Sequence, residues 1–176
     1  MTTTISGAEA MVRMLQLHGV QHIFGLCGDT SLPFYDALYR LDHGMQHILA
    51  RDERSAAYMA DVYARITGRV GVCVVTSGPG ATNTITAIAD AHRDNVPLIV
   101  ITGQVPTAAR NTDAFQETNI VEIAAPTAKK VYYLNRTEDM PVVLHEAFRL
   151  SVGQAWPKVL LEWPRHETTP ELMQAA

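Results

Sequence analysis

The chain has 176 residues, enough for one compact domain, and 47% of them are hydrophobic, which is typical of a globular protein. Its net charge of −4 and scattered Lys and Arg residues give no reason to expect a nucleic-acid or anionic-membrane partner. The two cysteines lack the spacing of a disulfide scaffold or a zinc site. No apolar stretch approaches the roughly 20 residues of a membrane span, and residues 1–4 do not resemble a signal peptide, so we expect a cytoplasmic location.

Predicted helices and strands alternate along the chain. Ser6 and Glu9 have the spacing of a capping box that begins the first helix, and Gly19 is placed to end it. Pro33 fits the first turn of a second helix, and Gly68 the end of a third. Further helices are predicted over residues 81–91 and 137–152, a loop over 103–114, and strands over 20–26, 45–50, 70–76, 98–102, 130–134 and 158–163.

This alternation predicts an α/β fold, a three-layer α/β/α sandwich with an open, mainly parallel six-stranded sheet. Residues 70–76 and 98–102 are almost continuously apolar, as in strands covered on both faces. No linker interrupts the chain, so we expect one domain over residues 1–166, followed by a loose polar tail over 167–176.

Open α/β sheets bind ligands beyond the carboxyl ends of their strands, which selects the loops after residues 26, 50, 76 and 102. The segment Thr76-Ser77-Gly78-Pro79-Gly80 follows one strand and opens a helix. Its glycines permit close approach of a ligand to the backbone, and the helix start presents N–H groups. The full GxGxxG and P-loop patterns are missing, so this segment alone fits a plain tight turn as well as a ligand loop.

Glu53 follows the second predicted strand within a charged run, Arg51-Asp52-Glu53-Arg54. The pattern alone favours a solvated helix start, where an acidic residue contributes about 0.3–1 kcal/mol. Its place at the sheet edge keeps a catalytic role open. The seven histidines form no HExxH motif and the chain has no GxSxG elbow, so metalloenzyme and hydrolase functions rank low.

Six segments in order resemble the N-terminal pyrimidine-binding (PYR) domain of thiamine-diphosphate (ThDP) enzymes, closest to acetolactate synthases and related carboligases and decarboxylases. They span nearly the whole chain, and their order is more specific than any one of them. Cys27 stands where the family usually has proline. The segments are FGLCG at 24–28, RDERSAAYMA at 51–60, TSGPGATN at 76–83, PLIVITGQVP at 97–106, FQE at 115–117 and PKVLLEWP at 157–164.

The resemblance assigns roles to individual residues. Glu53 falls on the catalytic glutamate, which hydrogen-bonds N1′ of the cofactor's aminopyrimidine and promotes its imino tautomer. Lys129 aligns with a lysine near the flavin of acetolactate synthases, but one lysine does not support FAD binding. Gln104, Phe115 and Gln116 match substrate-side positions, and the cofactor-binding positions are Cys27, Gly28, Glu53, Thr76, Gly78, Pro79, Gly80 and Asn83.

The family binds the diphosphate through Mg²⁺ at a G-D-G…N-N motif in a separate diphosphate-binding (PP) domain. This chain has only Gly28-Asp29-Thr30, at the wrong place and without the asparagines. The resemblance therefore implies that ThDP is shared with a partner PP subunit or domain, which holds the Mg²⁺, within a homo- or hetero-oligomer. It also implies a small 2-oxo acid substrate and an isolated chain that is inactive, whether the chain is a natural split subunit or a truncated fragment.

The sequence is also consistent with two other functions. A non-catalytic assembly or regulatory module could keep the PYR fold without turnover. A nucleotide-binding Rossmann domain would need an acidic residue about 20 positions beyond the glycines, whereas Asp94 comes too early and Glu117 too late. Carboligase and decarboxylase activities share this half of the site and are not separated by the sequence.

Overall fold

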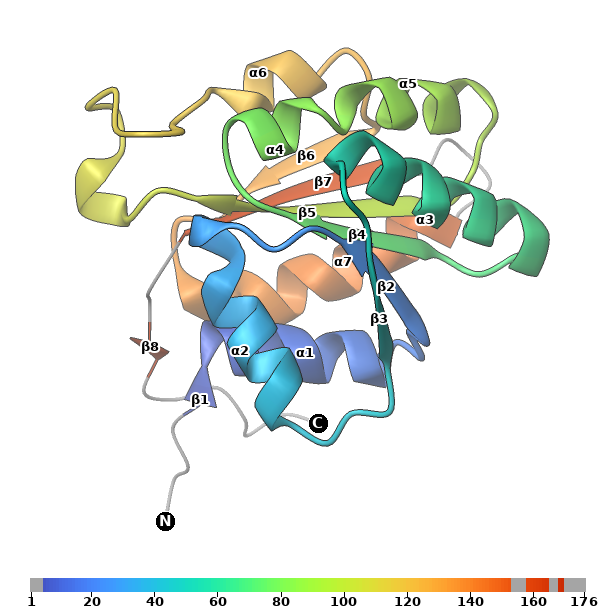
Figure 1. Cartoon of the computed structure of the whole chain (residues 1–176), viewed down its shortest axis with the longest axis horizontal. Helices are drawn as coiled ribbons and strands as arrows, with labels where there is room; N and C mark the ends of the chain where they lie inside the picture. The colour runs from blue at the N-terminus through green and yellow to red at the C-terminus, as the bar shows by residue number, and fades with distance from the viewer. Residues whose placement is uncertain (1–4, 153–157, 165–167, 170–176) are drawn as a thin grey trace.

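The computed structural model describes residues 5–152, 158–164 and 168–169 and confirms the predicted α/β/α sandwich (Figure 1). The central sheet has six parallel strands in the order β3-β2-β4-β5-β7-β6. Its strands are β2 (His22–Gly25), β3 (Gln46–Leu49), β4 (Gly71–Val75), β5 (Leu98–Gln104), β6 (Lys130–Tyr133) and β7 (Lys158–Pro164). β3 lies on one side of β2 and β4 on the other, so the order in which strands are added to the sheet reverses at this point. Ligands bind at such a switch point in folds of this kind.

Helices cover both faces of the sheet (Figure 1). One face carries α1 (Gly7–Leu17), α2 (Leu32–Arg40) and α7 (Met140–Val152). The other carries α3 (Glu53–Thr67), α4 (Pro79–Thr82), α5 (Ile85–Arg93) and α6 (Ile120–Ala124). Three short 3₁₀ turns join these elements: η1 (Asp29–Ser31), η2 (Thr107–Ala109) and η3 (Thr137–Asp139).

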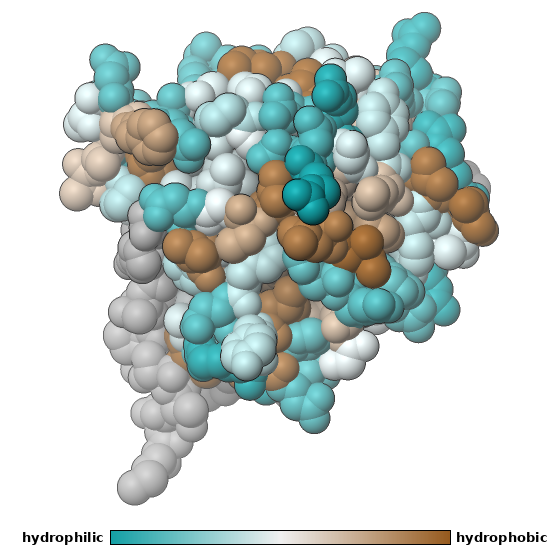
Figure 2. Space-filling model, in the orientation of Figure 1, coloured by the Kyte–Doolittle hydropathy of each residue, from teal (hydrophilic) through white to brown (hydrophobic). Residues whose placement is uncertain are grey.

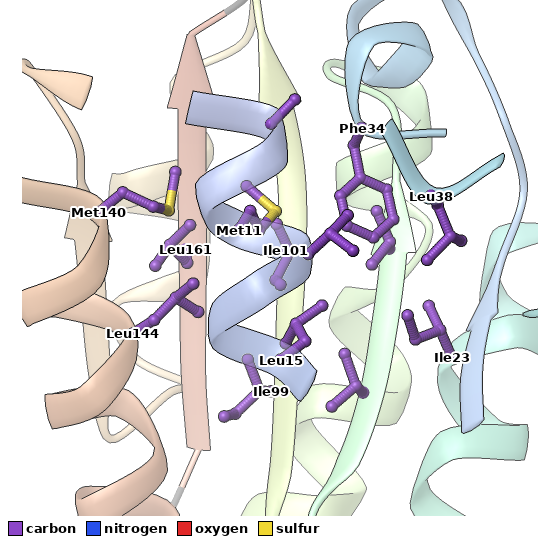
Figure 3. Packing of buried hydrophobic residues seen from close by; sticks show 14 of the residues in the cluster. Met11, Leu15, Ile23, Phe34, Leu38, Ile99, Ile101, Met140, Leu144 and Leu161 are labelled. Atoms are coloured by element: carbon purple, nitrogen blue, oxygen red, sulfur yellow. The ribbon is translucent and has the colours of Figure 1, made fainter. Parts of the chain in front are cut away.

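The first face is held by large aliphatic side chains (Figure 3). Met11 and Leu15 of α1 and Leu144 of α7 are fully buried, and they pack in one cluster with Ile99 and Ile101 of β5. Fully burying such a side chain contributes about 1.5–3 kcal/mol. This cluster holds the helices of the first face against the sheet. The carboxyl edge of that sheet, here called the ligand edge, carries the loops expected to bind a ligand.

The second face is packed with small residues, which let α3 lie close to the sheet. Ala56, Ala57, Ala60 and Ala64 are all buried beneath this helix. A Cβ on Gly71 of β4 would stand 2.1 Å from the carbonyl oxygen of Ala60, so helix and strand touch through their backbones. This close contact holds the middle of α3 against the start of β4.

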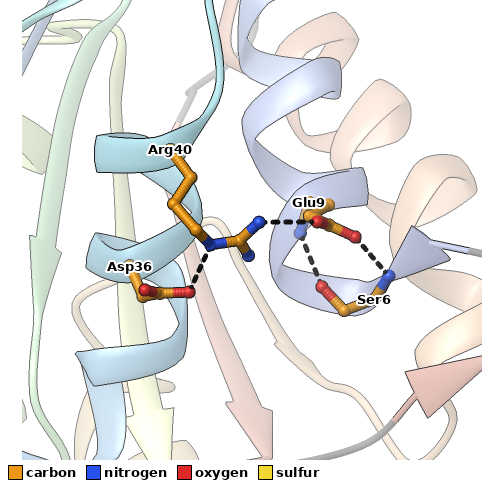
Figure 4. A network of polar contacts seen from close by, with 4 residues as sticks. All are labelled: Ser6, Glu9, Asp36 and Arg40. Carbon is orange, nitrogen blue, oxygen red and sulfur yellow. Dashed lines mark hydrogen bonds and ion pairs between the residues drawn. The ribbon is translucent and has the colours of Figure 1, made fainter.

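The predicted capping box at the start of α1 is confirmed (Figure 4). The Glu9 N–H donates to Ser6 Oγ at 3.2 Å, and the Ser6 N–H donates to Glu9 Oε2 at 2.9 Å. Arg40 of α2 then bridges Glu9 at 3.2 Å and Asp36 at 2.8 Å. The cap therefore also links α1 to α2.

The helix predicted over residues 81–91 is in fact two helices, α4 and α5, which meet at Asn83 and Thr84. The Thr84 hydroxyl donates to the Ala81 carbonyl at 2.7 Å, a local bond of the kind that competes with the helical ladder. β5 also continues to Gln104, two residues beyond its predicted end.

A small two-stranded sheet was not predicted. β1 (Ile5–Ser6) pairs antiparallel with β8 (Thr168–Thr169), which lies in the segment predicted as a loose tail. Residues 167 and 170–176 of that segment lie outside the described residues, so the division into a domain and a tail stays a prediction. None of the helices in the described ranges is both long and apolar enough to span a membrane.

Candidate functional site

The glycine segment after β4 forms a tight turn at the carboxyl edge of the sheet. The Gly80 N–H donates to the Ser77 carbonyl at 3.2 Å, and Gly78 has φ 57° and ψ −119°. These angles match the first central position of a type II′ turn, which strongly favours glycine. Pro79 then begins α4 with an exposed ring, so the segment is both a turn and a helix start.

Glu53 is the first residue of α3 and faces this turn. The Asp52 side chain caps the helix by accepting the Ser55 N–H at 3.2 Å, which leaves the Glu53 side chain available. Glu53 Oε2 accepts a hydrogen bond from Asn83 Nδ2 at 2.9 Å. Glu53 Oε1 lies 3.4 Å from the point where a Cβ on Gly80 would stand. Within residues 5–152, 158–164 and 168–169, Oε1 accepts no hydrogen bond, so one carboxylate oxygen is open beside the turn.

Two buried threonines join the loops of the ligand edge. Thr30 Oγ1 lies 3.0 Å from Thr76 Oγ1 and accepts the Ser77 N–H at 2.9 Å. A Cβ on Gly28 would stand 2.5 Å from Thr76 Cβ, and one on Gly103 would stand 2.1 Å from Thr30 Oγ1. The loops after β2 and β4 therefore pack against each other and against the end of β5. Thr30 was missed by sequence reasoning, because nothing in a Gly-Asp-Thr loop indicates a partner 46 residues away.

Most of the predicted cofactor-binding residues are brought together at this edge. Thr76 touches the positions of both Gly28 and Gly80, and Glu53 joins Gly80 to Asn83. Cys27 lies in the same loop as Gly28 and is exposed at the surface, although desolvation by the protein atoms around it raises the pKa of its thiol.

The three predicted substrate-side residues differ in their surroundings. The main chain of Gln116 lies against the turn, with its carbonyl oxygen 2.4 Å from the point where a Cβ on Gly78 would stand. Phe115 precedes it and is 84% exposed. Gln104 is buried at the end of β5, where its Oε1 accepts the Val105 N–H at 2.7 Å.

The remaining features expected from the sequence concern Lys129 and possible metal ligands. Lys129 Nζ donates to the Leu150 carbonyl at 3.2 Å, near the end of α7. In the part of the chain that the structure describes, no three His, Cys, Asp or Glu side chains are grouped so that they could hold a metal ion.

The arrangement defines a class of protein. It is a doubly wound, parallel α/β domain whose ligand edge combines an open carboxylate, a glycine turn and a helix start. Such an edge suits a planar ligand with ring nitrogens, because a carboxylate can exchange a proton with the ring while the glycines let it approach the backbone.

The chain belongs to the thiamine pyrophosphate enzyme family, because residues 5–123 match that family's N-terminal TPP binding domain. It is 47% identical over 163 residues to the acetolactate synthase of Arthrospira platensis, covering 92% of this chain and 28% of that protein. It is 48% identical over 157 residues to an acetolactate synthase large subunit of Buchnera aphidicola, covering 89% and 27% of the two chains. With the isozyme 3 large subunit of Escherichia coli the identity is 46% over 166 residues, covering 94% and 29%. The chain therefore spans less than a third of the length of these relatives.

Proposed function

We propose that this chain is the pyrimidine-binding part of a ThDP-dependent 2-oxo acid carboligase or decarboxylase of the acetolactate-synthase type. The observation that carries the proposal is the open oxygen of Glu53 beside Gly80, with the other oxygen held by Asn83. A solvated helix start would need neither the Asn83 contact nor the glycine turn opposite.

The residues at the edge fit an aminopyrimidine ring. Side chains at positions 28 and 80 would collide with Thr76, so glycine at both positions lets the two loops pack closely on Thr76. Glu53 Oε1 would share a proton with ring nitrogen N1′, and Asn83 would orient the carboxylate by holding Oε2. Peptide groups of residues 78–80 would line the ring. When bound, ThDP supplies the carbanion chemistry, while these residues bind and orient it.

The same proposal requires a partner. A PP subunit or domain would hold the diphosphate and Mg²⁺, since the chain covers only 27–29% of its relatives. Phe115 and Gln116 would face a small 2-oxo acid from this side of the shared site. The assembly would be a homo- or hetero-oligomer.

The outer face of α3 is the surface that we assign to the PP part. It begins at Glu53 and exposes Met59, Val62 and Ile66, at 41%, 47% and 78%. These side chains line an apolar groove of about 720 Å³ together with Tyr58. Figure 2 shows hydrophobic surface over this side of the molecule. A partner seated there would also enclose the open oxygen of Glu53.

The test is E53Q in the chain assembled with a PP part, with E122Q as the control. Glu122 is an exposed glutamate in the first turn of α6, and its side chain makes no hydrogen bond within the described residues. E53Q should lower ThDP-dependent turnover of pyruvate by about 10²-fold or more, as expected for loss of a proton-transfer group. E122Q should leave turnover unchanged, and both variants should keep the wild-type unfolding temperature. Full activity of a folded E53Q enzyme would show that the assigned role is wrong.

A further inference from the structure

The segment over residues 110–117, here called the 110–117 loop, has an unusual backbone. Asn111, Asp113 and Gln116 have φ values of 61°, 57° and 63°. Asn and Asp tolerate this left-handed conformation, because their short side chains bond the local backbone. Gln lacks that compensation, so the surrounding contacts must hold Gln116 in place.

The carboxylate of Glu117 is the group that holds the loop. Glu117 Oε1 accepts the Asn111 N–H at 2.5 Å, and Oε2 accepts the N–H groups of Thr112 and Ala114, both at 3.2 Å. The Glu117 N–H in turn donates to the Ala114 carbonyl at 2.8 Å. The Glu117 side chain thus accepts hydrogen bonds from three backbone N–H groups of the loop and holds them together.

Arg110 fastens the beginning of the loop to the sheet. Its Nη2 donates to the Leu134 carbonyl at 3.1 Å, and its Nη1 donates to Asn135 Oδ1 at 3.2 Å. Its guanidinium also lies 4.8 Å from the centre of the Tyr133 ring. With the start fixed by Arg110 and the interior by Glu117, the end of the loop has little freedom.

The end of the 110–117 loop lies in close contact with the glycine turn. The carbonyl oxygen and Cα of Gln116 lie 2.4 Å and 3.0 Å from the point where a Cβ on Gly78 would stand. Gly78 begins the turn whose other end, Gly80, faces Glu53. The contact joins two segments separated by 38 positions in the sequence.

We propose that Glu117 is a positioning residue, which folds the 110–117 loop so that the main chain of Gln116 holds the Gly78 turn beside Glu53. The importance of this turn for ThDP rests on the function proposed above, whereas the link from Glu117 to Gly78 does not. In the described part of the chain, the Glu117 carboxylate accepts hydrogen bonds from its own loop and none from the turn.

The test compares E117Q with E122Q in the full chain by amide NMR. E117Q should speed hydrogen exchange at Asn111, Thr112 and Ala114 by about tenfold or more, because charge-assisted bonds are lost. It should also shift the Gly78 amide signal, although Glu117 makes no bond to Gly78. E122Q should change neither. If the loop amides respond and the Gly78 signal does not move, Glu117 only folds its own loop and the positioning role is wrong.

Acid titration of the wild-type chain gives the same comparison if E117Q does not fold. The backbone N–H groups, that of Asn111 foremost, lower the pKa of Glu117 below its ordinary value. Protonation should therefore move the signals of Gly78 and of the loop amides in a single step, and separate steps would overturn the proposal. If the signals move together but added ThDP leaves Gly78 and Glu53 unmoved in the assembled enzyme, the proposed function fails and the positioning role stands.

Discussion

Replacing Gly78 with alanine should destabilise the chain through both its backbone conformation and a collision. A side chain at φ 57° and ψ −119° costs about 1–3 kcal/mol. The new Cβ would meet the Gln116 carbonyl oxygen at 2.4 Å, and relieving this overpacking costs about another 1–3 kcal/mol. The smaller entropy of the unfolded chain returns about 0.4–1 kcal/mol. With the middle of each range, the net loss should be about 3 kcal/mol.

G44A is the matched control for this change. Gly44 has φ 70° and nothing within 4 Å of the added Cβ, so no collision adds to the conformational cost. That cost of about 1–2 kcal/mol, less the same entropic return, leaves a net loss of about 1 kcal/mol. Urea unfolding and thermal unfolding, both followed by circular dichroism, would measure both variants. For a chain of this size, G78A should lower Tm by roughly 6–12 °C and G44A by roughly 2–4 °C. Equal losses in the two variants would show that Gln116 does not press on Gly78.

Two further predictions concern the face of the sheet opposite Glu53. L144A should lower the free energy of unfolding by about 2–5 kcal/mol in the same urea assay, because Leu144 is fully buried in the cluster of Figure 3, and a loss below 1 kcal/mol would contradict that packing. His18 stacks on Phe148 at 4.2 Å and lies 5.4 Å from His145, and partial burial, followed by the charge of His145, lowers the pKa of His18. A lowered pKa means that the unfolded chain binds the proton more readily than the folded chain does. The free energy of unfolding should therefore have its full value above pH about 6.5 and fall as the pH drops toward the lowered pKa of His18. H18Q should flatten this dependence on pH. A stability that rises over the same acid range would contradict the assignment.

The parts of the fold that could be predicted from the sequence are those set by local pattern. Residues 71–75 and 98–101 are continuously apolar and form the two central strands β4 and β5. The capping residues of α1 and the glycine that ends α3 lie where their local chemistry places them. The break between α4 and α5 was missed because it depends on the bond from Thr84 to Ala81 and on Asn83 being drawn to Glu53.

The candidate site was predictable only in part, for the same physical reason. Position at the carboxyl edge of the sheet indicated Glu53 and the glycine turn, and the resemblance supplied their roles. The contacts that hold the site together join distant positions, such as Thr30 with Thr76 and Gln116 with Gly78. Glu117 was visible in the sequence only as part of a matching FQE segment, since its function depends on how the 110–117 loop folds back on it.

Our central proposal is that the Glu53 carboxylate hydrogen-bonds the aminopyrimidine ring of ThDP beside the glycine turn. A crystal structure of the chain assembled with a PP part, ThDP and Mg²⁺ tests it most directly. We predict that N1′ of the ring lies within hydrogen-bond distance of Glu53 Oε1, the open oxygen, while Asn83 keeps its hydrogen bond to Oε2. A ring bound elsewhere, with Glu53 still directed only at Asn83, would contradict it.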